Sequence, residues 1–356
     1  MNQPTREMVE AMVNIATNGA LDRIDQRGKR ARELYRWGLH PHHAEAGSPL
    51  ATDNASFEAA YPLALSGGVG VTEESLFPLM SAAENLNAAG LLIEQRSRNR
   101  NVHAMPVMQL CRSAMESSAR TIWILGDPEC EVRRDRALSV LVEQLEQQKR
   151  FLIIADASVT SGPNQLPSNL VAMNRAHQQK QADLVKRLRD NYTVAKPESF
   201  SKTIGLAAEW VDKRLPAHDT GELAANGLGG GAKMAYSWGS GFVHGYKWAV
   251  DYVPGVRLFG MIADSLAAAI NMTECAVALY EAVCRAPGDE RNGDATGLVS
   301  RSRPVIDPAR LPIDIDNNSP EQAASDTLNG IECRECRVDR LGPDRDHDAR
   351  HLVAYP

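Results

Sequence analysis

The chain has 356 residues, 43% of them hydrophobic and only 5% aromatic, so it is long enough to bury a sizeable core. Ala, Leu, Glu, Gln and Arg recur in long runs while alternating strand patterns are hard to find, which predicts an all-α multi-helix bundle. Most of the net charge of −6 comes from residues 286–356, with 9 Lys/Arg and 14 Asp/Glu, and this balance argues against large-scale nonspecific binding of nucleic acid.

The sequence shows neither a secretion signal nor an uninterrupted membrane span. Its first ten residues, MNQPTREMVE, lack an apolar core, and the longest apolar stretch, about 261–284, is interrupted by acidic and amide side chains. Six cysteines over this length, with Cys111 and Cys275 inside helical patterns, indicate buried thiols in a reducing compartment rather than a disulfide framework. We therefore expect a cytoplasmic protein without a membrane partner.

Residues 1–71 predict an N-terminal helical segment followed by a loop. Residues 5–38 have helical composition, with Asn18-Gly19 as an expected break. The loop begins with His40-Pro41-His42-His43, whose three histidines could hold a metal. Only Glu45 lies at ligand spacing, however, so an exposed loop is the favoured interpretation.

Residues 72–285 carry the expected core of the bundle. Thr72-Glu73-Glu74 marks the start of its first helix, because acidic residues favour the first turn. Apolar periodicity predicts the further helices at about 103–125, 128–156, 168–191, 199–215 and 256–284. The last of these has heptad-like spacing that suits dimerisation or packing within its own bundle, and we favour the second.

The helix over 103–125 organises this core. Spacings of three and four place a narrow seam on one face: Ala104, Met108, Cys111, Met115, Ser118, Ile122 and Leu125. Arg112, Glu116 and Arg120 follow one another at i, i+4 and i+8 on a second stripe. This stripe is either a solvated face with two weak ion pairs or a surface that faces another helix, where an Arg–Glu pair would be desolvated and would orient a further group.

A glycine run and a second polar stripe lie between residues 221 and 248. Backbone amides of GLGGGAK could hold an anion with the help of Lys233, although a flexible loop is the favoured interpretation. Tyr236, Ser240 and His244 recur at i, i+4 and i+8, so they share the kind of stripe that the Arg–Glu pair would need as a partner. On its own, a histidine in an apolar helix is more often a hydrogen-bonded core residue than a catalyst.

The C-terminal residues predict a disordered linker and a candidate metal tail. Residues 286–330 are rich in Pro, Asp, Asn, Gly and Ser with little periodicity. Residues 331–356 supply four ligands at the spacing of a tetrahedral Cys2His2 zinc site: Cys333, Cys336, His347 and His351. The loop between them has no aromatic residue to pack inside it, so an exposed tail with free thiols is the alternative.

Two motifs carry a resemblance to a known group of proteins. RSAMESSARTIWIL at 112–125, followed by YSWGSGFVHG at 236–245, is similar to uncharacterised bacterial helical proteins with an Arg-x3-Glu helix and a later Ser-x3-His helix. Some of these are regarded as HEPN-like (higher eukaryotes and prokaryotes nucleotide-binding). The resemblance covers about residues 72–285 and implies one interior polar cluster: Arg112, Glu116, Ser240 and His244.

Related HEPN proteins imply a function and partners. Many are RNA-cleaving toxins or phage-defence effectors, and they are frequently homodimers, so RNA and a second copy are the partners that the resemblance implies. Their ribonuclease signature, Arg-x4-6-His near the last helices, does not precede His244 here. Arg98 and His103 have the Arg-x4-His spacing, but they lie in an expected link between helices.

Two functional hypotheses follow. The first is a metal-independent ribonuclease or related hydrolase in which His244 is the general acid or base and Glu116 orients it. The other polar side chains would contact the substrate, with Arg112 at its phosphate: Arg112, Ser240, Tyr236 and Arg120. The second is a noncatalytic helical binding or regulatory module in which the same cluster is a structural hydrogen-bond network.

Overall fold

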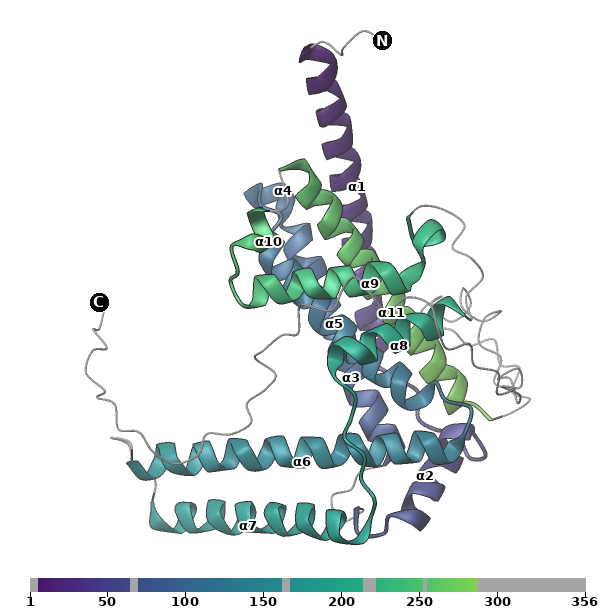
Figure 1. The fold of residues 1–356 in the computed structure, drawn as a ribbon, viewed down its shortest axis with the longest axis vertical. Helices are drawn as coiled ribbons and strands as arrows, with labels where there is room; N and C mark the ends of the chain where they lie inside the picture. Colours follow the sequence, from purple (N-terminus) through teal and green to yellow (C-terminus); the bar gives the residue numbers. More distant parts are fainter. Residues whose placement is uncertain (1–5, 65–69, 162–166, 214–221, 252–254, 287–356) are drawn as a thin grey trace, which may run out of the picture. The chain divides into compact units, whose positions relative to one another are not determined.

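The computed structural model of the chain describes residues 6–64, 70–161, 167–213, 222–251 and 255–286. Within these ranges the regular structure is helical and contains no strand, which confirms the all-α prediction (Figure 1). The expected linker and the predicted zinc ligands lie outside the described residues.

The helices follow one another with short connections. Their bounds are α1 (Arg6–Leu39), α2 (Pro49–Ala60), α3 (Val71–Glu94), α4 (Arg96–Asn99), α5 (Ala104–Leu125), α6 (Cys130–Ser161), α7 (Ser168–Asn191), α8 (Phe200–Asp212), α9 (Glu222–Val243), α10 (Trp248–Asp251) and α11 (Val256–Cys284). The predicted break at Asn18-Gly19 is absent from the described helix α1, which continues through both residues.

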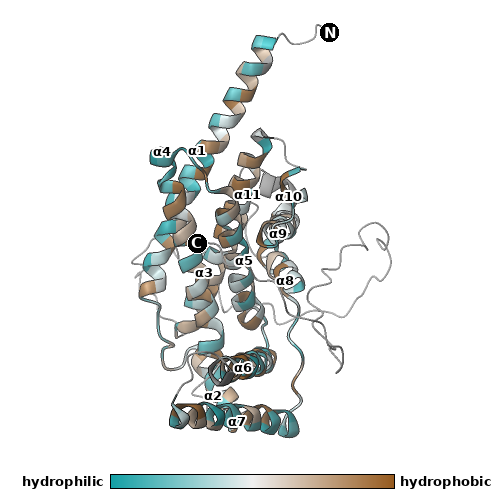
Figure 2. Ribbon diagram, turned by 90° about the vertical axis from the view of Figure 1, so that its left-hand side faces the viewer, coloured by the Kyte–Doolittle hydropathy of each residue, from teal (hydrophilic) through white to brown (hydrophobic). Residues whose placement is uncertain are grey.

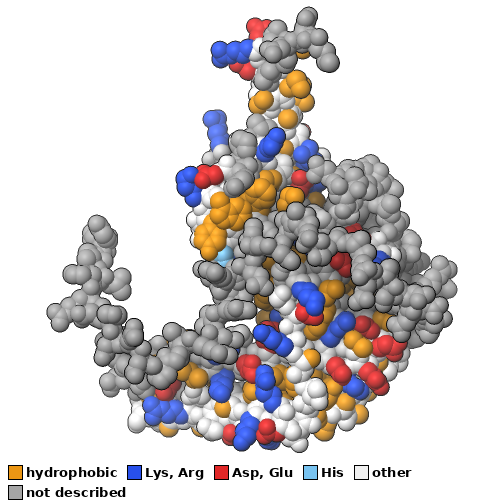
Figure 3. Space-filling model, in the orientation of Figure 1, with side chains coloured by type: hydrophobic (Ala, Val, Ile, Leu, Met, Phe, Trp, Pro, Cys, Tyr) orange, Lys and Arg blue, Asp and Glu red, His pale blue; other side chains and the backbone are white. Residues whose placement is uncertain are grey.

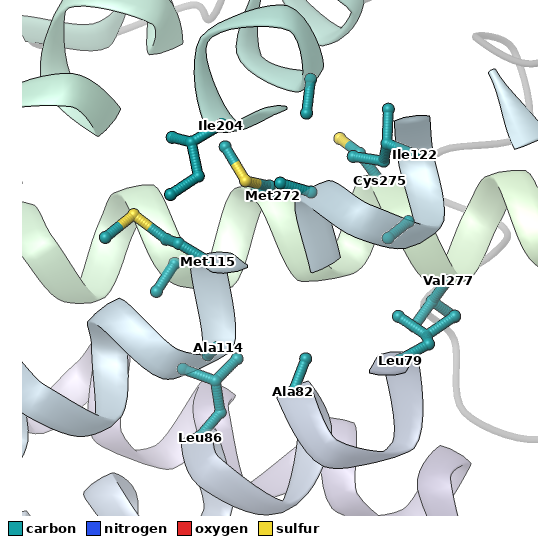
Figure 4. Close-up of a cluster of buried hydrophobic side chains, with 14 of the residues drawn as sticks. Leu79, Ala82, Leu86, Ala114, Met115, Ile122, Ile204, Met272, Cys275 and Val277 are labelled. Carbon is teal, nitrogen blue, oxygen red and sulfur yellow. The ribbon is translucent and has the colours of Figure 1, made fainter. Parts of the chain in front are cut away.

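Helix α5 lies at the centre of the core, as its apolar seam predicts. It packs against α3, α8, α9 and α11, while α1 packs against α3 and α11. Every seam residue from Met108 to Leu125 is buried. Figure 4 shows side chains of four helices pointing toward one another: Leu79, Ala82 and Leu86 of α3, Ala114, Met115 and Ile122 of α5, Ile204 of α8, and Met272, Cys275 and Val277 of α11.

The polar seam residue Ser118 and the neighbouring Thr121 both have hydrogen-bond partners on other helices. The hydroxyls of Ser118 and Thr273 lie 2.7 Å apart and link α5 to α11. The adjacent Thr121 hydroxyl donates to the Ser75 carbonyl of α3 at 2.7 Å. Burying a hydroxyl group that has a hydrogen-bond partner costs little free energy, and such hydrogen bonds fix the register in which the helices pack.

Two stretches, Val71–Asn99 and Arg257–Cys284, are long and apolar enough to cross a membrane by length and composition alone. The second is 89% buried among the other helices, which is the pattern of a core helix. In the hydropathy view of Figure 2, α3 and α11 sit among the other helices of this core. Packing within its own bundle, the favoured prediction for the last helix, therefore accounts for the apolar face of α11.

Helix α2 is an element that the sequence analysis placed in a loop. The Ser48 hydroxyl caps it by accepting a hydrogen bond from the Ala51 amide at 3.1 Å, and Pro49 occupies its first position. A buried ion pair then joins α2 to α6: Arg133 donates from Nε and Nη2 to the two carboxylate oxygens of Asp53, each at 2.7 Å. Asp53 is fully buried and Arg133 nearly so.

Replacing Asp53 should show how much this pair holds α2 in place. In Asp53→Asn the Arg133 guanidinium stays buried without a counter-charge, so the free energy of unfolding should fall by about 3 kcal/mol. Arg6→Gln, which removes an exposed pair with Glu10, is the control and should change it little. Urea denaturation of both variants measures the difference, and equal effects would contradict the structural role of the buried pair.

Candidate functional site

Helix α9 crosses α5 at unusually close range. A Cβ atom at Gly239 would lie 2.9 Å from the Arg112 Cβ and 3.2 Å from the Met108 carbonyl oxygen, so only glycine fits there. One turn toward the start of α5, the Gln109 amide donates to the Phe242 carbonyl at 3.1 Å. The Phe242 carbonyl, near the end of α9, also accepts a hydrogen bond from the Gly245 amide at 3.2 Å.

Three polar side chains meet at the crossing, and we call them the α5–α9 cluster: Arg112, Glu116 and Tyr236. Arg112 Nη2 lies 3.0 Å from Glu116 Oε1 and 3.5 Å from the Tyr236 hydroxyl. The guanidinium carbon also stands 5.0 Å from the centre of the Tyr236 ring, within the range of a cation–π contact. The arginine and glutamate side chains are only 17% and 20% exposed. For these two residues, the Arg–Glu stripe does face another helix.

Burial sets the electrostatics of the α5–α9 cluster. It raises the pKa of Glu116, against the opposing effect of the Arg112 charge. It likewise raises the pKa of Tyr236, with the Glu116 carboxylate acting in the same direction. For Arg112 burial acts to lower the pKa, but the charge of Glu116 and the contact with Tyr236 outweigh it, so the pKa ends above its usual value. Arg112 thus partly offsets the effect of burial on Glu116, and Glu116 stabilises the charged form of Arg112.

The contact inside the pair is electrostatic rather than a well-aligned hydrogen bond. Among the described residues, Arg112 Nε and Glu116 Oε1 are buried atoms without a hydrogen-bond partner, although the two side chains are in ionic contact. A charge pair of this kind depends on its partner for compensation, because removing either member leaves an isolated charge in a partly buried place.

The other two predicted catalytic residues follow Tyr236 along the chain, and His244 lies away from this pair. Ser240 is half-buried one turn beyond Tyr236. His244 follows the last residue of α9 and is exposed, with its ring centre 5.4 Å from that of Tyr246. Eight residues of helix span about 12 Å, so His244 lies well along the axis from the Tyr236 contact. The expected interior cluster therefore contains Tyr236 in place of His244.

Arg120 turns away from α9 and toward α6 and α8. Its Nη2 donates to Glu143 Oε2 at 3.0 Å, and its guanidinium carbon lies 4.9 Å from the centre of the Phe200 ring. The stripe of the sequence analysis thus divides between two neighbours, since its first two members contact α9 and its third contacts other helices. Arg120 does not share a substrate-facing surface with Tyr236.

A buried carboxyl group lies beside Arg120. Glu74 of α3 is 2% exposed, and its Oε2 accepts a hydrogen bond from the Gln144 amide at 2.7 Å. Burial raises the pKa of Glu74 to about 7, and the charge of Arg120 only partly opposes this shift. The protonation of Glu74 therefore changes near neutral pH.

The glycine run belongs to α9 rather than to a flexible loop. The anion that its backbone amides bind is the carboxylate of Asp212 in the same chain. Gly227 has a φ of +67°, which favours glycine, and there the helix kinks. The next two amides, of Leu228 and Gly229, donate to the two carboxylate oxygens of Asp212 at 2.7 and 2.9 Å. The amides predicted to bind an anion therefore receive the carboxylate that ends α8.

The histidine loop is partly tied to the core. His42 Nδ1 contacts Glu281 of α11, whose other oxygen accepts a hydrogen bond from the Trp37 indole at 2.6 Å. The His42 side chain remains 51% exposed. No group of three potential metal ligands occurs in the part of the chain that the structure describes. The Cys2His2 tail lies outside that part, and zinc there stays a prediction.

A surface that the sequence analysis missed follows directly from α9. We call it the α9–α10 patch: Val243, Tyr246, Trp248 and Val250, each 42 to 46% exposed. The Trp238 indole donates to the Ala249 carbonyl at 2.8 Å and holds α10 against α9. Figure 3 shows an apolar band over this region. The signal in the sequence is the density of Trp and Tyr between residues 236 and 248, in a chain with few aromatic residues.

Comparisons with known proteins add no relative. No family model, no curated protein and no solved structure matches the chain. The HEPN-like resemblance therefore rests on its two motifs, and the geometry above is what bears on function.

Glu74 gives a pH test of this geometry. A pKa of about 7 in the folded state, above the ordinary 4.5, means that folding favours the protonated form, so stability falls as pH rises from about 4.5 to 7. Above that window ionisation costs on the order of 3 kcal/mol. Glu74→Gln removes the cost and should raise the melting temperature at pH 8 but not at pH 4.5.

The matched control is Glu84→Gln, an exposed position on the same helix. Differential scanning calorimetry at both pH values measures the two variants. A gain from Glu74→Gln of the same size at both values would contradict the raised pKa, because a gain unrelated to ionisation does not depend on pH.

Proposed function

We propose that this chain is a noncatalytic helical binding module in which the α5–α9 cluster is a structural network and the α9–α10 patch is the binding surface. The single observation that supports the choice is the position of His244, exposed beyond the end of α9, while Tyr236 occupies the place beside Arg112 and Glu116. The proposed general acid or base is thereby separated from the groups that would orient it and bind phosphate.

The geometry of the pair supports a structural role. Arg112 directs its charge to Glu116 and Tyr236, and a guanidinium engaged in this way is not presented to a phosphate from solution. The contact also sits where Gly239 brings the two helices together, so it stabilises one crossing of α9 on α5. What the crossing positions is the far end of α9.

That far end has the properties of a binding surface. The four side chains of the α9–α10 patch expose a few hundred Å² of contiguous apolar area, a size that marks an interaction site on many proteins. Trp and Tyr are the residues most enriched where binding energy concentrates. The patch also packs against α9. A Cβ atom at Gly241 would lie 2.8 Å from the Trp248 ring, so the helix backbone and the indole are in close contact.

Glu116→Ala and His244→Ala separate the structural from the catalytic assignment. Removing Glu116 leaves Arg112 partly buried without its counter-charge, so the free energy of unfolding should fall by about 3 kcal/mol and the melting temperature by roughly 5 to 10 °C. His244→Ala alters an exposed side chain beyond the end of α9 and should lower the melting temperature much less than Glu116→Ala. Thermal unfolding, monitored by circular dichroism, measures the melting temperature of both variants. An unaltered melting temperature in Glu116→Ala would contradict the structural-network assignment.

A second candidate, RNA cleavage, is favoured by one observation in the loop before α5. The Asn99 amide nitrogen lies 2.8 Å from His103 Nε2, which orients the imidazole, and Arg98 and Arg100 are exposed beside it. Arg100 and His103 both have positive φ, 54° and 50°, a strained backbone for residues other than glycine. Such strain is common at functional sites, and Arg98 and His103 have the Arg-x4-His spacing associated with HEPN ribonucleases.

This candidate predicts that cleavage depends on His103 and not on His244. Purified wild-type protein incubated with labelled single-stranded RNA should give fragments, His103→Ala should reduce the cleavage rate at least a hundredfold, and His244→Ala should match the wild type. No cleavage by the folded wild type, or equal loss in both variants, counts against a ribonuclease site in this loop.

A further inference from the structure

The first three turns of α1 expose an apolar stripe. We call it the α1 stripe: Met8, Met12 and Ile15, which are 56, 65 and 73% exposed. Their i, i+4 and i+7 spacing puts them on one side of the helix. Burial of α1 in the bundle begins only at Ala20 and Ile24. Figure 1 shows this first part of α1 extending past α4 and the start of α11.

Apolar side chains are exposed both at the start of α1 and at the end of α9 with α10. In Figure 3, apolar side chains are visible both along the start of α1 and over the end of α9 and α10. Together these seven side chains expose roughly 700 Å² of apolar surface, close to the ~800 Å² that each partner contributes to a stable protein interface. Either surface alone falls short of that area.

Charge permits these surfaces to meet their own copies. On α1, Arg6 pairs with Glu10 at 2.9 Å, and beside the patch Lys247 pairs with Asp251 at 2.6 Å. Neither surface therefore carries a large uncompensated charge. The α6–α7 hairpin carries a small net positive charge instead, with ten Lys/Arg against seven Asp/Glu over residues 130–191, which disfavours its pairing with a second copy.

We infer that two copies of the chain associate reciprocally, with the α1 stripe of each copy packed on the α9–α10 patch of the other. A two-fold axis produces both contacts at once and covers all seven side chains, whereas a foreign partner would need two separate apolar faces. The inference rests on the proposed function, because it names the partner that the α9–α10 patch binds. It places the contact on surface helices and leaves α11 in the core.

The first test is the mass of the full-length protein in solution, by size-exclusion chromatography with light scattering. Wild type at micromolar concentration should have twice the chain mass of 38.9 kDa. Met12→Glu and Val250→Glu should each raise the dissociation constant at least a hundredfold and give monomers, because each introduces two buried charges per dimer. Phe77→Glu, at a side chain of α3 that is 74% exposed, is the control and should remain dimeric.

Mixing the two monomeric variants tests the reciprocal geometry. A heterodimer of Met12→Glu with Val250→Glu keeps one contact free of substitutions, so dimer should reappear in the mixture, more weakly than in wild type. A wild-type monomer overturns the inference. So does a dimer that survives Val250→Glu, since that result means that the α1 stripes pair with each other. Circular dichroism melting of each variant excludes unfolding as the cause of a lost dimer.

The two proposals fail separately. A wild-type monomer in which Glu116→Ala still lowers the melting temperature would overturn the dimer and keep the network. A dimer whose melting temperature is insensitive to Glu116→Ala would do the reverse. The oligomeric state therefore reports on the partner and the melting temperature on the α5–α9 cluster.

Discussion

The close approach of α9 to α5 is the constraint on which the rest of the candidate site depends. Gly239 allows the two backbones to meet at Arg112, and the meeting point decides which side chains share a desolvated space. Tyr236 is placed over the guanidinium as a result, and the Arg112–Glu116 pair loses solvent without losing its counter-charges. A side chain at position 239 larger than a hydrogen atom would push α9 away, rehydrate the pair and move the end of α9 together with α10. One glycine thus links the buried charges of the interior to the apolar surface outside.

Internal compensation of polar groups recurs elsewhere in the bundle, including at the glycine run and the histidine loop that the sequence suggested as binding sites. The amides at the kink of α9 are occupied by Asp212, the guanidinium of Arg133 by Asp53, and the carboxylate of Glu281 by Trp37 and His42. In each case a group that could bind a ligand from solution instead joins two helices. Helical bundles need such contacts because their helix ends and interhelical charges would otherwise be desolvated without a partner. Features that signal a site in a sequence are therefore also the features that hold a bundle together.

Much of the fold could be predicted because helical periodicity is local, whereas the site could be predicted only in part. The seam of α5 was correct, since it depends only on spacing along one helix. Two members of the Arg–Glu stripe do face α9, but Arg120 does not, because two crossing helices stay in contact for only a few turns. His244 shared a predicted stripe with Tyr236, yet α9 ends at Val243 and the stripe ends with it. Helix α2 was not predicted from the sequence. Its N-terminal cap, Ser48 followed by Pro49, lies in a stretch rich in glycine, asparagine and serine, which has the composition of a loop.

The interior and the surface of this protein differ in how completely their interactions are satisfied, and that difference indicates where its function lies. Inside, the charged groups discussed above have partners within the chain, so a ligand that bound there would first have to displace a helix contact. On the surface, the α1 stripe and the α9–α10 patch expose Met, Ile, Val, Tyr and Trp side chains to solvent, and clustered apolar exposure of this kind is typical of interaction sites. Apolar surface of this kind has a free-energy cost that only association removes. This contrast between a compensated interior and an exposed apolar surface is what supports the proposed binding role.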